Sequence, residues 1–243
     1  MIEIKLFKKI ELEGCTFLEG FPGTGLVGPM SISYMVNKLQ LEYVGYIKSD
    51  LFPPLVSIHK DTPMPPLRFY YSKKNSLLLL FAESGPSSEK SIYEISDAIY
   101  NFLKEKKIKK IISISGIPTQ NPNNFDVFAV ASTKELSEKI QKLGLKPIGE
   151  GVAAGVSAVI MMNAAIDNID DINILVQVNP QIIDPRYAEI AINSLNKLLN
   201  MNIDVIELDK EAKMVEDKVK ELLKKSKETR EGVIPESDPN MYT

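Results

Sequence analysis

Two kinds of apolar segment alternate along this chain, and their alternation restricts the fold more than any other feature. Short runs rich in β-branched or aromatic residues predict strands, and longer stretches with apolar residues three and four positions apart predict helices. Strands that alternate with helices usually lie side by side in the same direction, with the helices as crossovers. The pattern therefore predicts an α/β fold, a three-layer sandwich with a mostly parallel central sheet.

The predicted strands differ in how their faces are covered. The run 77–82 is apolar throughout, so we expect both of its faces to be buried. Residues 2–10 instead alternate apolar and charged side chains, which indicates an edge strand, and the prolines between 53 and 66 predict a loop or a sheet edge. The other predicted strands are residues 16–21, 43–48, 67–72, 110–115, 126–131 and 172–178. Of these, 67–72 is predicted to form a hairpin or a pair of strands with 77–82.

The predicted helices carry end signals of known chemistry. Asp184 followed by Pro185 places a capping residue before a proline at the first helical position, and Gly144 stands where a left-handed C-terminal cap belongs. Ser87 or Ser88 can cap the helix that follows them. The predicted helices are a stretch that ends near Leu39, residues 87–104, a short helix before Gly144, a helix within 149–166, and residues 184–199.

Composition places the chain among globular proteins whose core needs no metal or disulfide. Of its 243 residues, 44% are hydrophobic and 25% are charged, and the net charge is -3. A nucleic-acid-binding surface normally shows as a basic excess, and no apolar run approaches the ~18 residues that a membrane helix needs. We therefore expect no nucleic-acid partner, no membrane partner and a cytoplasmic location.

One glycine-rich segment has the spacing of a phosphate-binding loop. Gly23, Gly25 and Gly28 satisfy G-x-G-x-x-G between a predicted strand and a predicted helix, and Asp50 follows the next strand, where a ribose-binding acid would lie. The loop is a possible anion-binding site, so a nucleotide- or phosphate-binding α/β enzyme is the alternative function. Glycines here also allow tight turns and close helix–sheet packing, and Pro29 is atypical of the fingerprint. We favour the structural interpretation because no catalytic set accompanies the loop.

A second glycine cluster precedes another predicted helix. Gly149, Gly151 and Gly155 lead into a segment of small residues. Close approach of neighbouring backbones is the simplest interpretation of this composition, and an anion site is the alternative.

The side chains that most often perform catalysis are few. His59 is the only histidine and Cys15 is the only cysteine, so we interpret both as structural and expect no zinc site. Asp167, Asp170 and Asp171 follow a predicted helix, and a solvated turn is favoured over a metal site. We predict no catalytic residue, no metal and no cofactor, and therefore no enzyme.

The pattern changes after residue 203. A highly charged helix is predicted there, with an apolar residue every three or four positions, which makes a narrow heptad seam. The seam either packs on its own domain or also meets a neighbouring subunit. The seam residues are Leu208, Ala212, Val215, Val219 and Leu222. The predicted parts of the chain are a single α/β domain over 1–203, a C-terminal helix over 204–231 and a flexible tail over 232–243.

The last three residues resemble a known docking signal. Met241, Tyr242 and Thr243 form the order hydrophobic, tyrosine, any residue, which matches the C-terminal signature by which proteasome activators enter pockets of the core particle's outer ring. Tyr242 offers an apolar ring with a polar tip, Met241 adapts to an apolar groove, and a terminal carboxylate would pair with a cation. A random chain end is the alternative.

The segment EGFPGTGLVG at residues 19–28 resembles the signature of the proteasome assembly chaperone 2 family in its archaeal branch. The cluster at 149–155, the helix start at Asp184 and the C-terminal tail are also similar to that family, so the resemblance covers essentially the whole chain. It implies a fold similar to nucleoside-phosphorylase-like proteins without their catalysis. It also implies a homo-oligomer whose Met241, Tyr242 and Thr243 bind the α-subunit ring of the core proteasome, as an assembly chaperone or an ATP-independent activator.

Overall fold

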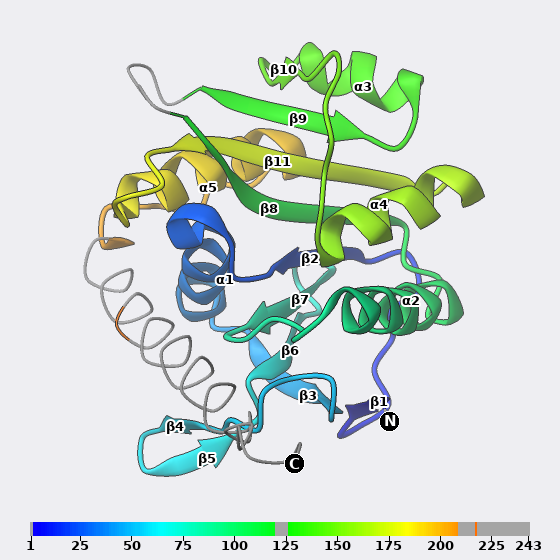
Figure 1. Cartoon of the computed structure of the whole chain (residues 1–243), viewed down its shortest axis with the longest axis vertical. Helices are drawn as coiled ribbons and strands as arrows, with labels where there is room; N and C mark the ends of the chain where they lie inside the picture. Colours follow the sequence, from blue (N-terminus) through cyan, green and yellow to red (C-terminus); the bar gives the residue numbers. More distant parts are fainter. Residues whose placement is uncertain (1, 120–125, 209–216, 218–243) are drawn as a thin grey trace, which may run out of the picture.

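A nine-stranded sheet organises the residues that the computed structural model describes, which are 2–119, 126–208 and 217 (Figure 1). Its strands are β1 (Ile2–Leu6), β2 (Thr16–Gly20), β3 (Glu42–Ser49), β6 (Leu67–Ser72), β7 (Leu77–Ala82), β8 (Lys110–Pro118), β9 (Val127–Ala131), β10 (Lys146–Pro147) and β11 (Asp170–Val178). Across the sheet their order is β1-β3-β6-β7-β2-β8-β11-β9-β10. A separate two-stranded sheet pairs β4 (Ser57–His59) with β5 (Thr62–Met64).

The sheet is mixed, which corrects the prediction of a mostly parallel sheet. β7, β2, β8 and β11 run parallel at its centre. β1, β3, β6 and β7 pair antiparallel in that order, and β9 lies antiparallel to β11. The reason lies in the connections: residues 73–76 join β6 to β7 through a tight turn that reverses the chain, whereas parallel neighbours need a crossover. The predicted pairing of 67–72 with 77–82 is confirmed by β6 and β7. The sequence does not predict the antiparallel pairing of β1 with β3, of β3 with β6 or of β9 with β11.

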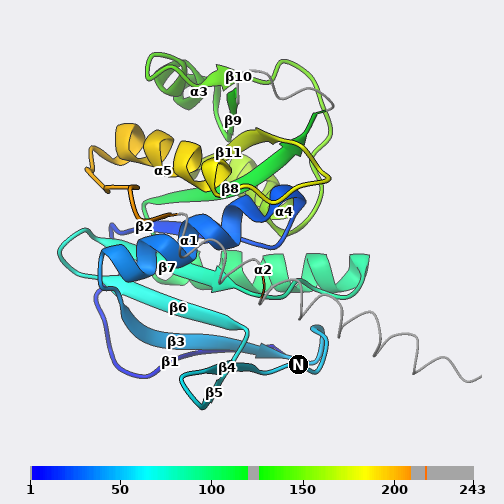
Figure 2. The same cartoon turned by 90° about the vertical axis from the view of Figure 1, so that its left-hand side faces the viewer.

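Helices cover both faces of the sheet. α1 (Val27–Lys38) and α5 (Pro185–Leu199) pack on one face, and α2 (Glu89–Glu105) and α4 (Val156–Asp167) pack on the other. Adjacent residues of β2 point to opposite sides, so Leu18 joins the core under α1 and α5 while Phe17 joins the core under α2 and α4. In Figure 2, α1 and α5 lie on the side of the sheet toward the viewer. The α/β prediction is confirmed, and likeness to nucleoside phosphorylases stays a prediction.

The remaining described helix, α3 (Lys134–Gln141), packs beside β9 and β10 at one end of the sheet. It is the short helix that the sequence predicts before Gly144, whose φ of +87° confirms the left-handed position. None of the described helices is both long enough and apolar enough to cross a membrane.

Two predicted helix starts are confirmed by their caps. At α2, the Ser88 hydroxyl accepts a hydrogen bond from the Ser91 N–H at 3.2 Å, and the Ser91 hydroxyl accepts one from the Ser88 N–H at 2.8 Å. At α5, Asp184 Oδ1 accepts from the Arg186 N–H at 2.9 Å, and Pro185 is the first helical residue. Each cap is a contact between residues two or three positions apart, which explains why the sequence alone predicts where these helices begin.

The proline-rich stretch contains the β4–β5 hairpin, which the sequence did not predict. A buried ion pair holds this hairpin against the main sheet, since Arg68 Nη1 of β6 donates to Glu83 Oε2 at 2.7 Å. The Ser57 hydroxyl of β4 donates to the same carboxylate oxygen, and Arg68 Nη2 lies 3.0 Å from His59 Nε2. His59 therefore takes part in a structural network. The partners come from strands distant in sequence, so no local pattern predicts the hairpin.

Candidate functional site

The predicted docking residues Met241, Tyr242 and Thr243 lie outside the described residues, as do nearly all of the predicted C-terminal helix and the whole of the predicted tail. Their role as a docking signal therefore stays a prediction. The described residues instead bring the two glycine clusters together around a cavity.

The first glycine segment is shaped by close packing. Gly25 has a φ of +70°, a left-handed conformation that favours glycine, in the short 3-10 turn η1 (Thr24–Leu26). A Cβ on Gly28 would lie 2.7 Å from the Cα of Gly20 and from the main-chain oxygen of Ile114. Two glycines therefore let the start of α1 rest directly on the backbone of β2 and β8. The geometry supports the structural interpretation of this G-x-G-x-x-G spacing.

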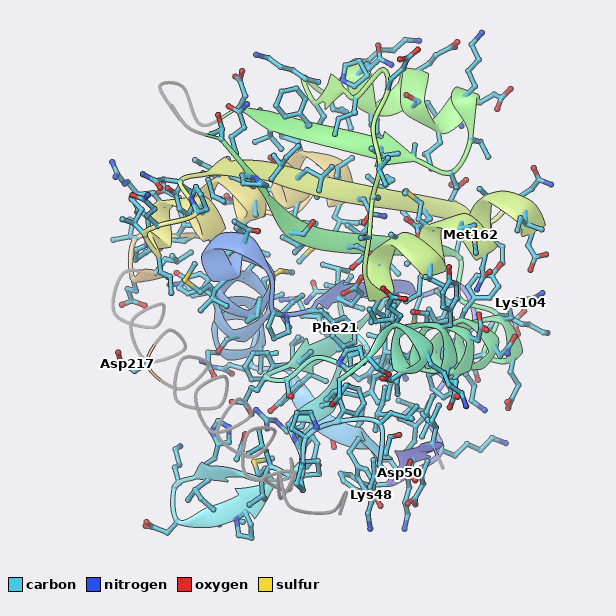
Figure 3. All side chains as sticks on the ribbon, viewed as in Figure 1. Phe21, Lys48, Asp50, Lys104, Met162 and Asp217 are labelled. Atoms are coloured by element: carbon cyan, nitrogen blue, oxygen red, sulfur yellow. The ribbon has the colours of Figure 1, made fainter. Side chains whose placement is uncertain are left out.

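Asp50 does not lie where a ribose-binding acid would. It follows β3, and β6 and β7 separate β3 from the β2 strand that leads into the glycine segment. Figure 3 shows Asp50 near β1 and β3, away from Phe21 of the glycine segment. In a dinucleotide-binding fold the second strand neighbours the first, so this part of the nucleotide hypothesis is wrong.

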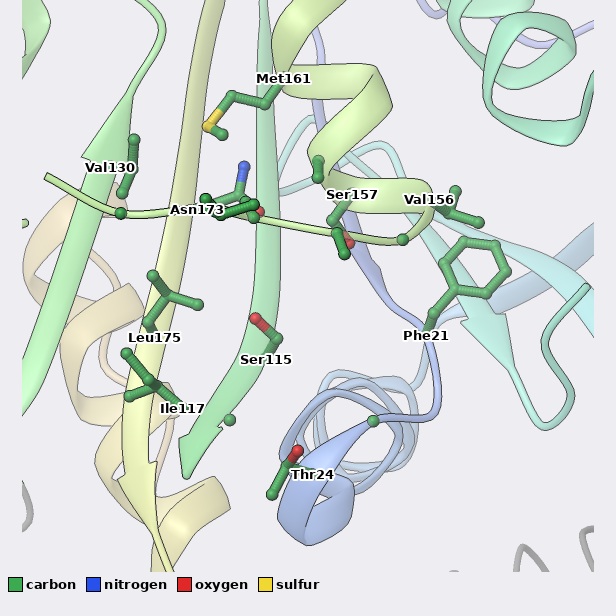
Figure 4. A pocket seen from close by; sticks show the side chains of 18 of the residues that line it. Phe21, Thr24, Ser115, Ile117, Val130, Val156, Ser157, Met161, Asn173 and Leu175 are labelled. Carbon is green, nitrogen blue, oxygen red and sulfur yellow. The ribbon is translucent and has the colours of Figure 1, made fainter. Parts of the chain in front are cut away.

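A cavity of about 800 Å³ lies between the two glycine clusters (Figure 4). Residues 21–24 form one side of it, residues 115–118 at the end of β8 form another, and residues 148–158 before and within α4 close it. Asn173 and Leu175 of β11 line it as well. This volume falls within the range of about 300–1,000 Å³ that is usual for small-molecule sites.

The cavity lies where open α/β sheets most often bind ligands. It is at the carboxyl ends of the parallel strands β2, β7 and β8. The chain leaves β2 toward α1 on one face of the sheet and leaves neighbouring β7 toward α2 on the other face. A crevice opens outside the strands at such a switch point, because the two connections diverge.

The cavity lining is mainly apolar, with a few polar groups. Thr24, Ser115, Ser157 and Asn173 supply hydroxyl and amide groups, and Glu150 is the lining carboxylate. Glu150 is exposed to solvent. Among the lining residues there is no lysine, arginine or histidine.

Behind the cavity lies a row of buried polar side chains on the sheet face that α4 covers. Glu19 of β2 is opposite Ser113 of β8, which in turn is opposite Asn173 of β11. Asp171 lies two residues before Asn173, so it points to the same face. Both oxygens of Glu19, the Ser113 hydroxyl and Asp171 Oδ2 make no hydrogen bond within the described part of the chain. Polar atoms without a hydrogen-bond partner are uncommon in protein interiors, so a group of them beside a cavity is a reason to consider this region as a binding site.

Burial raises the pKa of the Glu19 carboxyl above its usual range. The hydroxyls of Ser113 and Ser157 and the Phe21 amide lie near enough to favour its ionised form, without hydrogen bonds of normal geometry to it. Burial, and then the charge of Glu19, raise the pKa of Asp171 well above its usual range, while a hydrogen bond from Asn173 opposes this. Both shifts have the same main cause, because burial away from water penalises the charged form of a carboxyl.

The aspartates at 167, 170 and 171 are not one solvated turn, which corrects the sequence interpretation. Asp171 is fully buried in β11, whereas Asp167 at the end of α4 accepts hydrogen bonds from Lys104 Nζ at 2.5 Å and Tyr100 Oη at 2.9 Å. The described residues contain no group of three or more side chains suited to hold a metal ion. Cys15 is buried, as its structural interpretation requires, and burial raises the pKa of its thiol.

Sequence reasoning missed Glu19, Ser113 and Asn173 as members of one site. A signal was present, because Glu19 and Asn173 are polar residues inside strands that are otherwise largely apolar. Their meeting depends on β2, β8 and β11 being neighbours, which no local pattern shows.

The fold and the cavity together define a mixed α/β sandwich with a small-molecule-sized cavity at its switch point. The model of the PAC2 family matches residues 17–223, and the chain belongs to the PAC2 family.

Several of the known proteins similar to this chain are from archaea. Uncharacterized protein MJ0106 of Methanocaldococcus jannaschii is 32% identical over 214 residues, which cover 88% of this chain and 87% of that protein. The crystal structure of Pyrococcus furiosus PbaA, an archaeal homolog of proteasome-assembly chaperone, is 29% identical with a TM-score of 0.82, and the match covers 95% of this chain and 100% of PbaA. Pyrococcus furiosus PbaB, an archaeal proteasome activator, is 20% identical with a TM-score of 0.77 over 91% of this chain and 98% of PbaB, and supports the fold alone.

Proposed function

We propose that this protein is a non-enzymatic, cytoplasmic binder of the core proteasome that acts as an assembly chaperone or an ATP-independent activator. Membership of the PAC2 family, with likeness to PbaA over nearly the whole of both chains, is the observation that supports this most. PbaA is described as a homolog of proteasome-assembly chaperone, which makes a proteasome-related role the natural hypothesis for this chain. The proposed partner is the α-subunit ring.

The proposed contact is the C-terminal segment Met241, Tyr242 and Thr243. The Tyr242 ring would fill an apolar pocket while its hydroxyl reaches a polar group at the rim. The terminal carboxylate would pair with a cationic side chain in a charge-assisted hydrogen bond. Any side chain suits Thr243 in this arrangement, because only its carboxylate is recognised.

Self-association is the second part of the proposal, and α4 offers a surface for it. The only charged residue of this helix is Asp167 at its end, and its apolar residues Met162 and Ile166 are exposed. Val152, just before the helix, is fully exposed. A helix that is apolar nearly all round is normally buried, so a second copy packed here would cover it. Several tails on one oligomer would then raise the apparent affinity, provided that their geometry fits the ring.

The proposal keeps three parts of the chain: a domain over 1–203, a helix over 204–231 and a flexible docking tail over 232–243. Near the first boundary, the Tyr34 hydroxyl donates to the main-chain oxygen of Asp204 at 2.6 Å, and Leu208 is buried in the core with α1 and α5. Leu208 is the first residue of the predicted heptad seam, so its burial supports packing of the seam's beginning on its own domain.

The test is co-sedimentation of the full-length protein with purified archaeal core particle. We expect Tyr242→Ala to abolish co-sedimentation, and Thr243→Ala, the matched control, to leave it unchanged. One glycine appended after Thr243 should also abolish it, because it displaces the carboxylate. The oligomeric state, measured by light scattering, should be the same for all variants. Undiminished capture of the Tyr242→Ala protein would refute tail docking.

The alternative is a nucleotide- or phosphate-binding enzyme that uses Gly23, Gly25 and Gly28. The cavity beside these glycines gives it one favourable observation. The charge of the cavity counts against this alternative, since its described lining residues include the carboxylate of Glu150 and no lysine, arginine or histidine. Calorimetry with ATP and GTP tests this alternative: saturable heat that disappears on Gly25→Val would favour it over the chaperone proposal.

A further inference from the structure

We propose that the cavity between the two glycine clusters binds a small, uncharged, planar heterocycle, held by hydrogen bonds to Asn173 and to the first turn of α4 and stacked on Phe21. This inference does not depend on proteasome binding by the tail, because the cavity consists entirely of described residues of the α/β domain. The two proposals can therefore succeed or fail separately.

Asn173 is the buried polar group that points to a ligand. Its side chain is 5% exposed and lines the cavity. Its Nδ2 donates to Asp171 Oδ1 at 3.0 Å, which fixes the orientation of the amide. Its Oδ1 accepts no hydrogen bond from the described residues, so an oriented acceptor is left available. Figure 4 shows the Asn173 side chain between the strands and the segment that leads into α4.

The first turn of α4 supplies the complementary donors. Gly155 precedes this helix and provides no capping side chain, whereas side chains cap α2, α3 and α5. The first N–H groups of a helix have no partner inside the helix. Those of Val156, Ser157 and Ala158 donate to no described group, and all three residues line the cavity. A ligand with a carbonyl or ring-nitrogen acceptor on one edge and an N–H donor nearby would satisfy both the helix and Asn173.

Charge decides which ligands fit. Amides at a helix N-terminus attract anions in general. Here, however, Glu150 is the lining carboxylate, and none of the described lining residues is cationic. A phosphate would therefore be held by backbone dipoles alone, in a cavity that a carboxylate also lines. A cation would meet only one lining carboxylate, that of Glu150, whose exposure to solvent screens its charge. An uncharged ligand can hydrogen-bond to the N–H groups of α4 and to the Asn173 oxygen, and it brings no charge out of water.

The apolar lining favours a flat ring. Phe21 lines the side of the cavity, with its ring next to Val156 (Figure 4). Aromatic faces pack well against other planar rings in an offset arrangement. The remaining apolar side chains form walls without charge, and they include Ile92, Ile117, Val130, Met161 and Leu175.

The test uses full-length protein, isothermal calorimetry and a fixed set of probes. The uncharged probes are adenosine, guanosine, uridine, thymine and nicotinamide, and the charged probes are AMP and putrescine. We expect at least one uncharged probe to bind saturably with a submillimolar Kd. AMP and putrescine should bind at least ten times more weakly than that probe. The proposal is overturned if no uncharged probe binds in this range, or if AMP binds more tightly than adenosine.

Variants then locate the site. Asn173→Ala should weaken binding of the best uncharged probe at least tenfold, because the ligand's donor loses its acceptor. Asn101→Ala, on the exposed side of α2, is the matched control and should leave Kd unchanged. If Asn173→Ala does not fold, Ala154→Trp serves instead, since Ala154 is an exposed lining residue and a large ring there obstructs the cavity. Unchanged binding in the folded variant would place the ligand elsewhere and refute the proposal.

Discussion

Replacing Gly28 with alanine should destabilise the protein, although alanine is the better helix former. The added Cβ would lie 2.7 Å from the Cα of Gly20 and from the oxygen of Ile114, whereas carbon atoms in good contact are about 3.5–4.0 Å apart. Both neighbours are main-chain atoms, so neither can rotate away and α1 must move off the sheet. Overpacking of this kind costs about 1–3 kcal/mol, and the exchange of glycine for alanine within a helix regains about 1 kcal/mol. Because the Cβ would clash with main-chain atoms of two strands, we expect the overpacking cost to lie in the upper part of its range. The cost then exceeds the stability gained from alanine's helix propensity.

The assay is urea unfolding followed by circular dichroism, with a thermal scan beside it. We expect a net loss of about 1–2 kcal/mol, which for a chain of this length lowers Tm by roughly 2–8 °C. Gly149→Ala is the matched control, because an added Cβ there would meet nothing within 4 Å. Its stability should stay within about 0.5 kcal/mol of the original protein. If Gly28→Ala proves as stable as the original protein, the close packing of α1 on β2 does not constrain this position and the structural role assigned to the glycine is wrong.

Two further perturbations test the buried charges. Glu83→Ala should lower the free energy of unfolding in urea by about 3–5 kcal/mol, because it leaves the Arg68 guanidinium buried without its carboxylate partner. Lys8→Ala, which breaks an exposed ion pair, is the control and should lower it by less than about 1 kcal/mol. Equal losses would contradict this reasoning. Glu19→Gln should change the pH dependence of stability. A carboxyl whose pKa is raised on folding stabilises the folded state below its unfolded pKa of about 4.3, and this contribution is lost as pH rises through the folded pKa. In thermal scans, the Tm of Glu19→Gln minus the Tm of the original protein should therefore be larger at pH 8 than at pH 5. If this difference does not change with pH, the Glu19 carboxyl does not change its protonation on unfolding.

Part of the candidate site can be predicted from the sequence. The two glycine clusters, each before a helix, indicate where backbone approaches closely, and the structure places both at one cavity. The polar row behind the cavity could not be predicted in the same way. Asp171 follows a helix closely enough in sequence to suggest a turn, yet β11 begins at Asp170 and buries it. Whether a polar residue near a strand end is solvated depends on which helix covers it, and α4 covers this one.

The local features of this protein follow from its residues without knowledge of the tertiary fold. The caps at Ser88 and Asp184 set the starts of two helices, and the uninterrupted apolar run of β7 required cover on both faces, because these effects act between residues close in the chain or on one segment alone. The order of the strands, the contact between Gly20 and Gly28, and the placing of Glu19 opposite Ser113 on the sheet face that also carries Asp171 depend on the tertiary structure. These features either bring together segments that are far apart in the chain or depend on how neighbouring segments pack. The energies of the contacts depend on burial, which arises only when the whole sheet and its covering helices have assembled.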